Sequence, residues 1–161
     1  MSRLDSVINR LTAQRACLRL AAELIRDVPG PVLEIGLGNG RTYDHLRELL
    51  PARAIFAFDR RSNAHPDSTP DAAHLILGEF ADTIPGALAR IGAPAALAHA
   101  DFGSGDGPGT AALAAWLGPA LAPLLRPGTV VASDQRLDIP GSTPLALPEG
   151  VAPARYFLYL C

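Results

Sequence analysis

The stretch VLEIGLGNGRTYDHL, residues 32–46, decides the fold. A short apolar run typical of a buried strand carries an acid, Glu34, and then gives way to three glycines followed by helix-like sequence. Gly36, Gly38 and Gly40 have no Cβ atom, so the chain can turn sharply there while a ligand approaches the backbone closely. A plain tight turn needs only one glycine. We therefore interpret the loop as a cradle for a ligand.

The composition is that of a cytoplasmic globular protein, and residues 1–161 have the size of a single domain. The net charge is −2 and aromatic residues make up only 6% of the chain, so the basic stripe with interleaved aromatics that is typical of a nucleic-acid binder is missing. No apolar run approaches the roughly 18 residues that a membrane span needs, and the N-terminus has no signal-peptide core. Nucleic acid and membrane are therefore disfavoured as partners, and a small-molecule substrate is favoured.

Hydrophobic periodicity divides the chain into an N-terminal helix within residues 1–30, a core over residues 31–134 and a short tail over residues 135–161. The first helix begins at a capping box, Ser2-x-x-Asp5. Strands are expected at residues 32–35, 54–58, 74–77, 95–100, 129–133 and 155–160. Further helices are expected at residues 41–50, 83–91 and 110–125, the last one interrupted at Gly118-Pro119. Trp116, within that helix, is expected in the core.

Strands that alternate with helices through short connections imply right-handed crossovers and a parallel sheet covered on both faces. The expected fold is therefore a doubly wound α/β domain. Ligands of such sheets bind beyond the carboxyl ends of the strands. Four of those ends carry an acid, namely Asp59, Glu79, Asp101 and Asp134. We expect the chemistry to gather around them.

The spacing of the glycines indicates the kind of ligand. A dinucleotide loop reads GxGxxG, whereas this loop reads ExGxGxG from Glu34 to Gly40. Negative charge is unfavourable beside a pyrophosphate but favourable beside an ammonium or a sulfonium. The segment resembles the first motif of the class I S-adenosylmethionine-dependent methyltransferases. The resemblance implies a Rossmann-like, mostly parallel sheet and S-adenosyl-L-methionine as the cofactor.

The resemblance also implies roles for individual residues. Asp59 corresponds to the acid that holds the ribose, and Glu79 lies where the family contacts adenine. Tyr43 could reach the methionyl end, with Gln14 and Arg15 as candidates for its carboxylate. The cofactor-binding residues so implied are Glu34, Gly36, Gly38, Gly40, Tyr43, Asp59, Arg60, Gly78, Glu79, Phe80 and Asp101.

The tail departs from the family pattern. Residues 135–161 are rich in proline and offer room for one strand, whereas a typical member continues with a helix and two strands. The fold is therefore expected to have a truncated C-terminal part. This favours a homodimer or higher homo-oligomer in which a second subunit closes the substrate pocket.

Methyl transfer needs an aligned donor and acceptor, and a base only when the acceptor carries a proton. The catalytic candidates are Asp101, the neighbouring His99, and Asp134. Together with Gln135, the two acids resemble the magnesium-binding set of catechol-type O-methyltransferases. Acids at strand ends also cap loops and position the cofactor amino group, so no residue is assigned to a metal and magnesium stays an alternative.

The leading hypothesis is methyl transfer from S-adenosylmethionine to a small-molecule acceptor, with oxygen as the acceptor atom considered first. One alternative is a non-catalytic module that binds S-adenosylmethionine or S-adenosylhomocysteine. Another is an NAD(P)-binding oxidoreductase, which the glycines and Asp59 support and which the loop spacing and Glu34 oppose.

Overall fold

The computed structural model of the chain describes residues 2–103 and 106–161. Its centre is a seven-stranded sheet with the strand order β3-β2-β1-β4-β5-β7-β6. The strands are β1 (Val32–Ile35), β2 (Ile55–Asp59), β3 (Leu75–Leu77), β4 (Ala95–Ala100), β5 (Leu125–Ser133), β6 (Thr143–Pro144) and β7 (Phe157–Leu160). The first five strands run parallel, β7 is antiparallel to β5, and β6 is antiparallel to β7. The expected doubly wound, mostly parallel α/β fold is confirmed.

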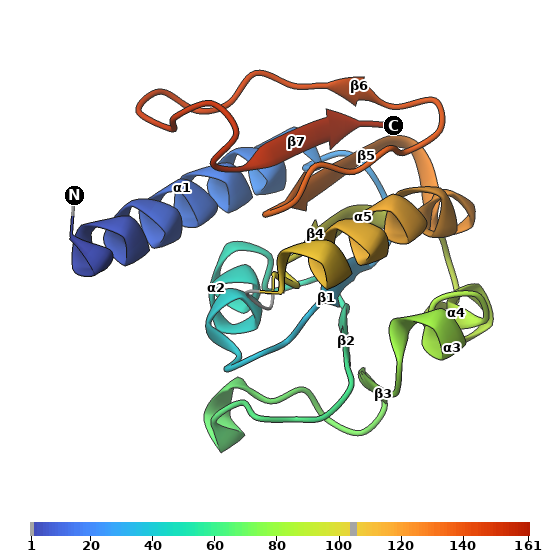
Figure 1. Cartoon of the computed structure of the whole chain (residues 1–161). Coiled ribbons are helices and arrows are strands. Elements are labelled where there is room, and N and C mark those ends of the chain that lie inside the picture. The colour runs from blue at the N-terminus through green and yellow to red at the C-terminus, as the bar shows by residue number, and fades with distance from the viewer. Residues whose placement is uncertain (1, 104–105) are drawn as a thin grey trace.

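Helices cover both faces of this sheet (Figure 1). They are α1 (Arg3–Leu24), α2 (Arg41–Leu49), α3 (Phe80–Thr83), α4 (Ala87–Ile91) and α5 (Gly107–Leu121), with short 3-10 turns η1 (Pro66–Ser68) and η2 (Ala122–Leu124). The capping box of α1 is present, because the Ser2 hydroxyl accepts from the Asp5 amide and the Asp5 carboxylate accepts from the Ser2 amide.

Side chains of the strands alternate between two hydrophobic cores, as the pleat of a strand requires. Leu33 points to the core that α4 and α5 cover, while Val32 points to the core under α1 and α2. β4 is mostly alanine and is nevertheless buried along its whole length. The small side chains of this strand let the helices pack closely on both faces. Glu34 and His99 lie on the same side as Val32, so both are turned toward α1 and α2.

Two helices differ from the sequence-based expectation. Residues 83–91 were expected to form one helix, but α3 ends at Thr83 and α4 begins at Ala87. Pro85 lies between them and has no N–H group to donate to the preceding turn. The interruption expected at Gly118-Pro119 is also wrong, since α5 continues to Leu121. Gly118 instead allows a close approach, because a Cβ atom there would lie 2.4 Å from the carbonyl oxygen of Asp138.

The tail contains two strands rather than the single one expected. β6 and β7 complete the sheet, so the expectation of a C-terminal part that lacks a strand is wrong. Residues 134–142, all of which are described, form a loop without a helix. The tail is short because this connection is short. The argument for a second subunit from a missing strand therefore lapses. Within residues 2–103 and 106–161, no helix has the length and apolar character to cross a membrane.

Candidate functional site

A cleft runs along the carboxyl ends of the parallel strands, where the sequence predicted the site. It consists of two adjoining lobes of about 540 and 470 Å³, a size within the range of small-molecule sites. The residues that line both lobes are Gly36, Gly38, Asp101 and Gly103. The end of the glycine loop and the end of β4 therefore form the junction of the two lobes.

The first lobe, here called the aromatic lobe, lies between the ends of β2 and β3 and the start of α5. Its main lining residues are Asp59, Glu79, Phe80, Phe102, Leu113 and Trp116. Arg60 lines it as well. Three of the four acids expected at strand ends, all except Asp134, thus line one lobe. Trp116 was expected in the core, but it is only half-buried and faces the cleft. Its position three residues after Leu113 on α5 puts both side chains on one face of the helix.

The second lobe, here called the polar lobe, lies between α1 and the start of α2. Its polar lining residues are Arg10, Gln14, Asn39, Arg41, Thr42, Asp101 and Asp134. Of these, sequence reasoning named Gln14 and the two acids. Arg10 and Gln14 are four residues apart and so share one face of α1, a spacing that was visible in the sequence. Arg15, the expected partner of the cofactor carboxylate, is exposed and does not line the cleft.

The three glycines of the loop have positive φ angles and serve two different purposes. A Cβ atom on Gly36 would lie 2.1 Å from the carbonyl oxygen of Asp101, and one on Gly40 would lie 2.5 Å from that of Ser68. These two glycines therefore allow backbone segments to pack closely. A Cβ atom on Gly38 would meet nothing within 4 Å. Gly38 borders both lobes of the cleft, so it is the glycine that keeps the cleft open.

Asp59 holds the glycine loop from the end of β2. Its Oδ2 accepts a hydrogen bond of 2.8 Å from the backbone N–H of Gly38, and its side chain also lines the aromatic lobe. The carboxylate therefore connects the loop to the cleft. A substitution that removes it affects the loop as well as any ligand.

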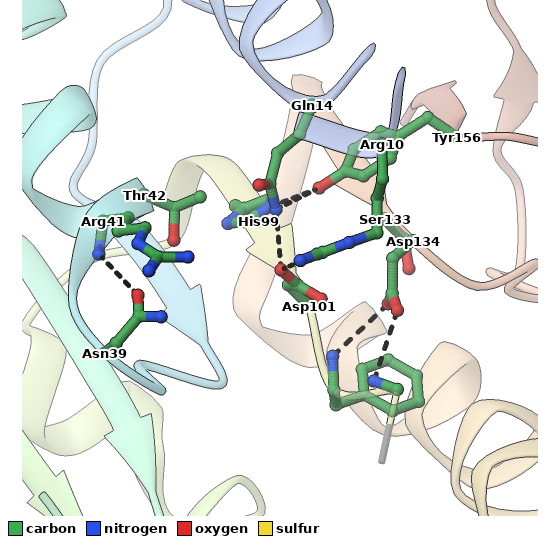
Figure 2. A network of polar contacts seen from close by, with 12 residues as sticks. Arg10, Gln14, Asn39, Arg41, Thr42, His99, Asp101, Ser133, Asp134 and Tyr156 are labelled. Atoms are coloured by element: carbon green, nitrogen blue, oxygen red, sulfur yellow. Dashed lines mark hydrogen bonds and ion pairs between the residues drawn. The ribbon is translucent and has the colours of Figure 1, made fainter. Parts of the chain in front are cut away.

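Asp101 receives hydrogen bonds from α1 at the junction of the lobes (Figure 2). Its Oδ2 accepts from Nε2 of Gln14 at 2.7 Å and from Nη1 of Arg10 at 3.5 Å. The same Gln14 nitrogen lies 3.5 Å from the hydroxyl oxygen of Tyr156. The long first helix thus forms one side of the polar lobe.

Asp134 caps the loop that follows β4. Its carboxylate accepts from the backbone N–H groups of Phe102 and Gly103 at 3.3 and 3.2 Å and from Nε2 of Gln135 at 2.9 Å. Burial, together with the negative charge of Asp101, raises the pKa of Asp134 above its ordinary value. Gln135 presents its amide nitrogen to Asp134, so Asp101, Asp134 and Gln135 do not offer three oxygen ligands to magnesium. No cluster of three metal-ligating side chains was found among the described residues.

Glu34 and His99 form a buried pair behind the cleft rather than within it. Both side chains are fully buried, and His99 Nδ1 lies 2.6 Å from Glu34 Oε2. The Thr42 hydroxyl donates to Oε1 of Glu34, and His99 Nε2 is hydrogen-bonded to the hydroxyl of Tyr156. The structure therefore does not bring His99 to the cleft, and its place argues against a direct role as a general base.

The protonation of this network follows from its surroundings. Burial by itself lowers the pKa of His99, but the carboxylate of Glu34, helped by the charges of Asp101 and Asp134, outweighs it and leaves that pKa above its ordinary value. Burial raises the pKa of Tyr156 well above its ordinary value, so the phenol keeps its proton. Sequence reasoning missed Tyr156, because a tyrosine next to a short final strand carries no signal of its own.

Three further residues that the resemblance implied, Gly40, Tyr43 and Gly78, do not line either lobe. Tyr43 is buried in the core under α1 and α2, with the Arg47 guanidinium 5.1 Å from its ring centre. Gly78 has a φ of +146° and makes room for Thr83, whose Cγ2 would lie 2.9 Å from a Cβ atom there. The side chains that reach the cleft are instead Thr42, one residue before Tyr43, and Glu79, one residue after Gly78.

The arrangement of elements is that of known methyltransferases. The structure of an S-adenosyl-L-methionine methyltransferase from Silicibacter pomeroyi DSS-3 matches with a TM-score of 0.93 and 43% identity, over 100% of this chain and 99% of that one. The antibiotic-resistance methyltransferase Kmr shares the fold, with a TM-score of 0.50 and 16% identity over 86% of this chain and 90% of that one. DesVI from Streptomyces venezuelae also shares it, with a TM-score of 0.51 and 15% identity over 93% of this chain and 66% of that one. No curated protein matches the sequence significantly.

The family model described as S-adenosyl-L-methionine methyltransferase matches residues 1–161. The chain belongs to this family and is an S-adenosylmethionine-dependent methyltransferase. Membership in the family removes the nicotinamide oxidoreductase alternative and the non-catalytic module. The cleft fits the cofactor for three reasons. Gly38 has no side chain that would obstruct the cleft, carboxylates are available for hydroxyl and ammonium groups, and aromatic side chains are available for the adenine ring.

Proposed function

We propose that the protein transfers a methyl group from S-adenosylmethionine to an oxygen atom of a small-molecule acceptor that enters the polar lobe. The observation that carries this proposal is the division of the cleft, in which an aromatic lobe and a polar lobe meet at Gly38 and Asp101. When bound, the cofactor supplies an electrophilic methyl group on its sulfonium. The residues of the chain hold and align the reactants.

The aromatic lobe suits the nucleoside part of the cofactor. Asp59 can accept from the ribose hydroxyls with the lone pairs that the Gly38 amide does not use. Trp116 and Phe80 offer apolar faces to adenine, and Glu79 can accept from its amino group.

The polar lobe suits the amino-acid part of the cofactor and the acceptor. Asp101 can receive the ammonium group, since Gln14 and Arg10 engage only its Oδ2. Arg10 can bind the carboxylate, because it already extends into this lobe. Both contacts come from residues that α1 and the end of β4 present at the junction.

The placement of the cofactor is tested by calorimetric titration of two Asp59 variants with S-adenosylhomocysteine. Asp59→Ala removes the carboxylate, and we expect binding to weaken by about 1.5–3 kcal/mol, as for the loss of a charged hydrogen bond. Asp59→Asn is the matched control for the loop, because its amide oxygen can still accept from Gly38. We expect it to bind with intermediate affinity. If both variants bind as tightly as the wild type, the ribose is held elsewhere.

The acceptor class is tested with isotopically labelled methyl donor. The enzyme is incubated with the small-molecule fraction and, separately, with the macromolecular fraction of a cell extract, and heat-inactivated enzyme serves as the control. We expect label in the small-molecule fraction, in products whose methyl group is bonded to oxygen. Label only in protein or nucleic acid would contradict the proposal.

A further inference from the structure

Two arginines extend toward the same space in the polar lobe from facing helices (Figure 2). Arg10 comes from α1 and Arg41 from the first turn of α2, and both line this lobe. Arg10 has a carboxylate partner, since its Nη1 lies 3.5 Å from Asp101 Oδ2. For the Arg41 guanidinium, no hydrogen bond or ion pair is found with any of residues 2–103 and 106–161. A guanidinium that lines a groove without a carboxylate partner favours the binding of an anion there.

The charge of the lobe supports the same conclusion, provided that the cofactor binds as proposed above. Arg10, Arg41, Asp101 and Asp134 balance one another when all are ionised. S-adenosylmethionine carries a sulfonium, an ammonium and a carboxylate, so its arrival adds one positive charge. An acceptor with a single negative charge restores the balance, whereas a doubly charged phosphate exceeds it.

The lobe also offers no free base. None of the four histidines, all of which are described, lines either lobe. Asp134 accepts hydrogen bonds at both of its oxygens, and Asp101 accepts from α1 at Oδ2 and is assigned above to the cofactor ammonium through its other oxygen. A base is needed only when the acceptor atom carries a proton. The lobe is therefore suited to an acceptor that arrives already deprotonated.

We propose that the acceptor is a small carboxylic acid, held through its carboxylate by Arg41 and methylated on a carboxylate oxygen to give a methyl ester. In this step a C–O bond forms to the methyl carbon while the S–C bond breaks and its electron pair stays on sulfur. The negative charge of the carboxylate and the positive charge of the sulfonium disappear together, and no proton moves. The neutral ester then loses its attraction to Arg41, which favours its release.

Arg41 is assigned to the acceptor rather than to the cofactor because the cofactor has only one carboxylate. A single guanidinium satisfies a carboxylate through two parallel hydrogen bonds. Arg10 lies beside Asp101, the residue proposed to receive the cofactor ammonium, so it is the arginine placed for the neighbouring carboxylate of the same amino-acid group. Arg41 is then free for a second anion.

The test uses the complex with S-adenosylhomocysteine, which occupies the cofactor site and cannot react. Calorimetry measures the binding of benzoate to this complex, with benzamide as the neutral probe of the same shape and inorganic phosphate as a second anion. The variants are Arg41→Gln and, as the matched control, Arg15→Gln, an exposed arginine outside the cleft. We expect benzoate to bind at least about tenfold more tightly than benzamide, and Arg41→Gln, but not Arg15→Gln, to remove this preference.

The outcomes separate this inference from the proposed function on which it rests. If wild-type protein fails to bind S-adenosylhomocysteine, both fall. If it binds that ligand but binds benzoate no more tightly than benzamide and no more tightly than phosphate, only the carboxylate acceptor is overturned. If Arg41→Gln instead weakens S-adenosylhomocysteine about tenfold, Arg41 holds the cofactor carboxylate and the inference is also overturned.

Discussion

Glu34 of β1 and His99 of β4 are neighbours across two parallel strands, and Nδ1 of the histidine lies 2.6 Å from Oε2 of the glutamate with both side chains fully buried. The acid of the glycine motif is therefore occupied by the protein itself. Glu34 also accepts a hydrogen bond from Thr42 in the first turn of α2, whereas Asp101 is an acid that lines both lobes of the cleft.

Glu34→Gln is expected to lower the pKa of His99, because burial then acts on the imidazole without the opposing carboxylate. Removing one partner of a buried pair should cost about 3 kcal/mol, near the lower end for such pairs because the imidazole can lose its proton. NMR titration of the imidazole and denaturant unfolding measure the two effects. Glu48→Gln is the control, because Oε2 of the exposed Glu48 lies 3.6 Å from Nδ1 of His45. We expect this substitution to lower the free energy of unfolding by less than about 1 kcal/mol.

The same pair has a defined pH dependence. The pKa of His99 is higher in the folded protein than in the unfolded chain, so its contribution to stability is fully present below the unfolded pKa. That contribution is lost as pH rises through the folded-state pKa of His99. The difference in unfolding free energy between wild type and Glu34→Gln should therefore shrink as the pH rises through the folded-state pKa of His99. A difference that grows with pH would contradict the assignment.

Tyr156→Phe is expected to weaken cofactor binding although the residue lies outside the cleft. The hydroxyl contacts both His99 and Gln14, and Gln14 in turn donates to Asp101. Loss of the Tyr156 hydroxyl should lower the free energy of unfolding by about 1–2 kcal/mol. Tyr159→Phe is the matched control, because that hydroxyl also has a buried partner, the Leu137 amide, but no route to the cleft. Equal effects of the two variants on S-adenosylhomocysteine affinity would argue against this positioning role.

Gly36→Ala and Gly38→Ala should separate the two purposes of the glycine loop. At Gly36 the new Cβ atom would lie 2.1 Å from the Asp101 carbonyl oxygen, so we expect a loss of stability on the order of 3 kcal/mol or more. At Gly38 the Cβ atom meets no protein atom within 4 Å, and only the left-handed backbone costs about 1–2 kcal/mol. Thermal unfolding and calorimetry should find the second variant folded but deficient in binding.

Trp116 offers a direct optical report of the aromatic lobe, because it is the only tryptophan of the chain. Binding of S-adenosylhomocysteine should change its fluorescence with the same saturation curve that calorimetry gives. Trp116→Ala should weaken binding by about 1–3 kcal/mol through the loss of stacking against the base. Calorimetric binding without a change in fluorescence would place the adenine elsewhere.

The sequence predicted the glycine loop and the strand-end acids because both carry signals that depend on chain order alone. Glycines between a strand and a helix, and acids directly after apolar runs, lie at one edge of a parallel sheet whatever the details of packing. The doubly wound, mostly parallel fold and the edge of the sheet at which the cleft lies could therefore be predicted.

The failures have physical causes that chain order does not reveal. His99 and Asp101 are two residues apart, but β4 ends between them, so Asp101 reaches the cleft while His99 stays under α1. Tyr43 turns to the core where its neighbour Thr42 turns to the cleft. β6 has only two residues and shows no period. In each case tertiary packing decides the direction of a side chain or the existence of a strand.

Cofactor binding in this cleft is tested most directly by a calorimetric titration of purified protein, freed of carried-over ligand, with S-adenosylhomocysteine and NADH in parallel. The cleft described here predicts binding of S-adenosylhomocysteine in the range of about 1 µM to 1 mM and no binding of NADH. Binding of NADH alone would contradict the assignment of the glycine loop, the aromatic lobe and the polar lobe to S-adenosylmethionine.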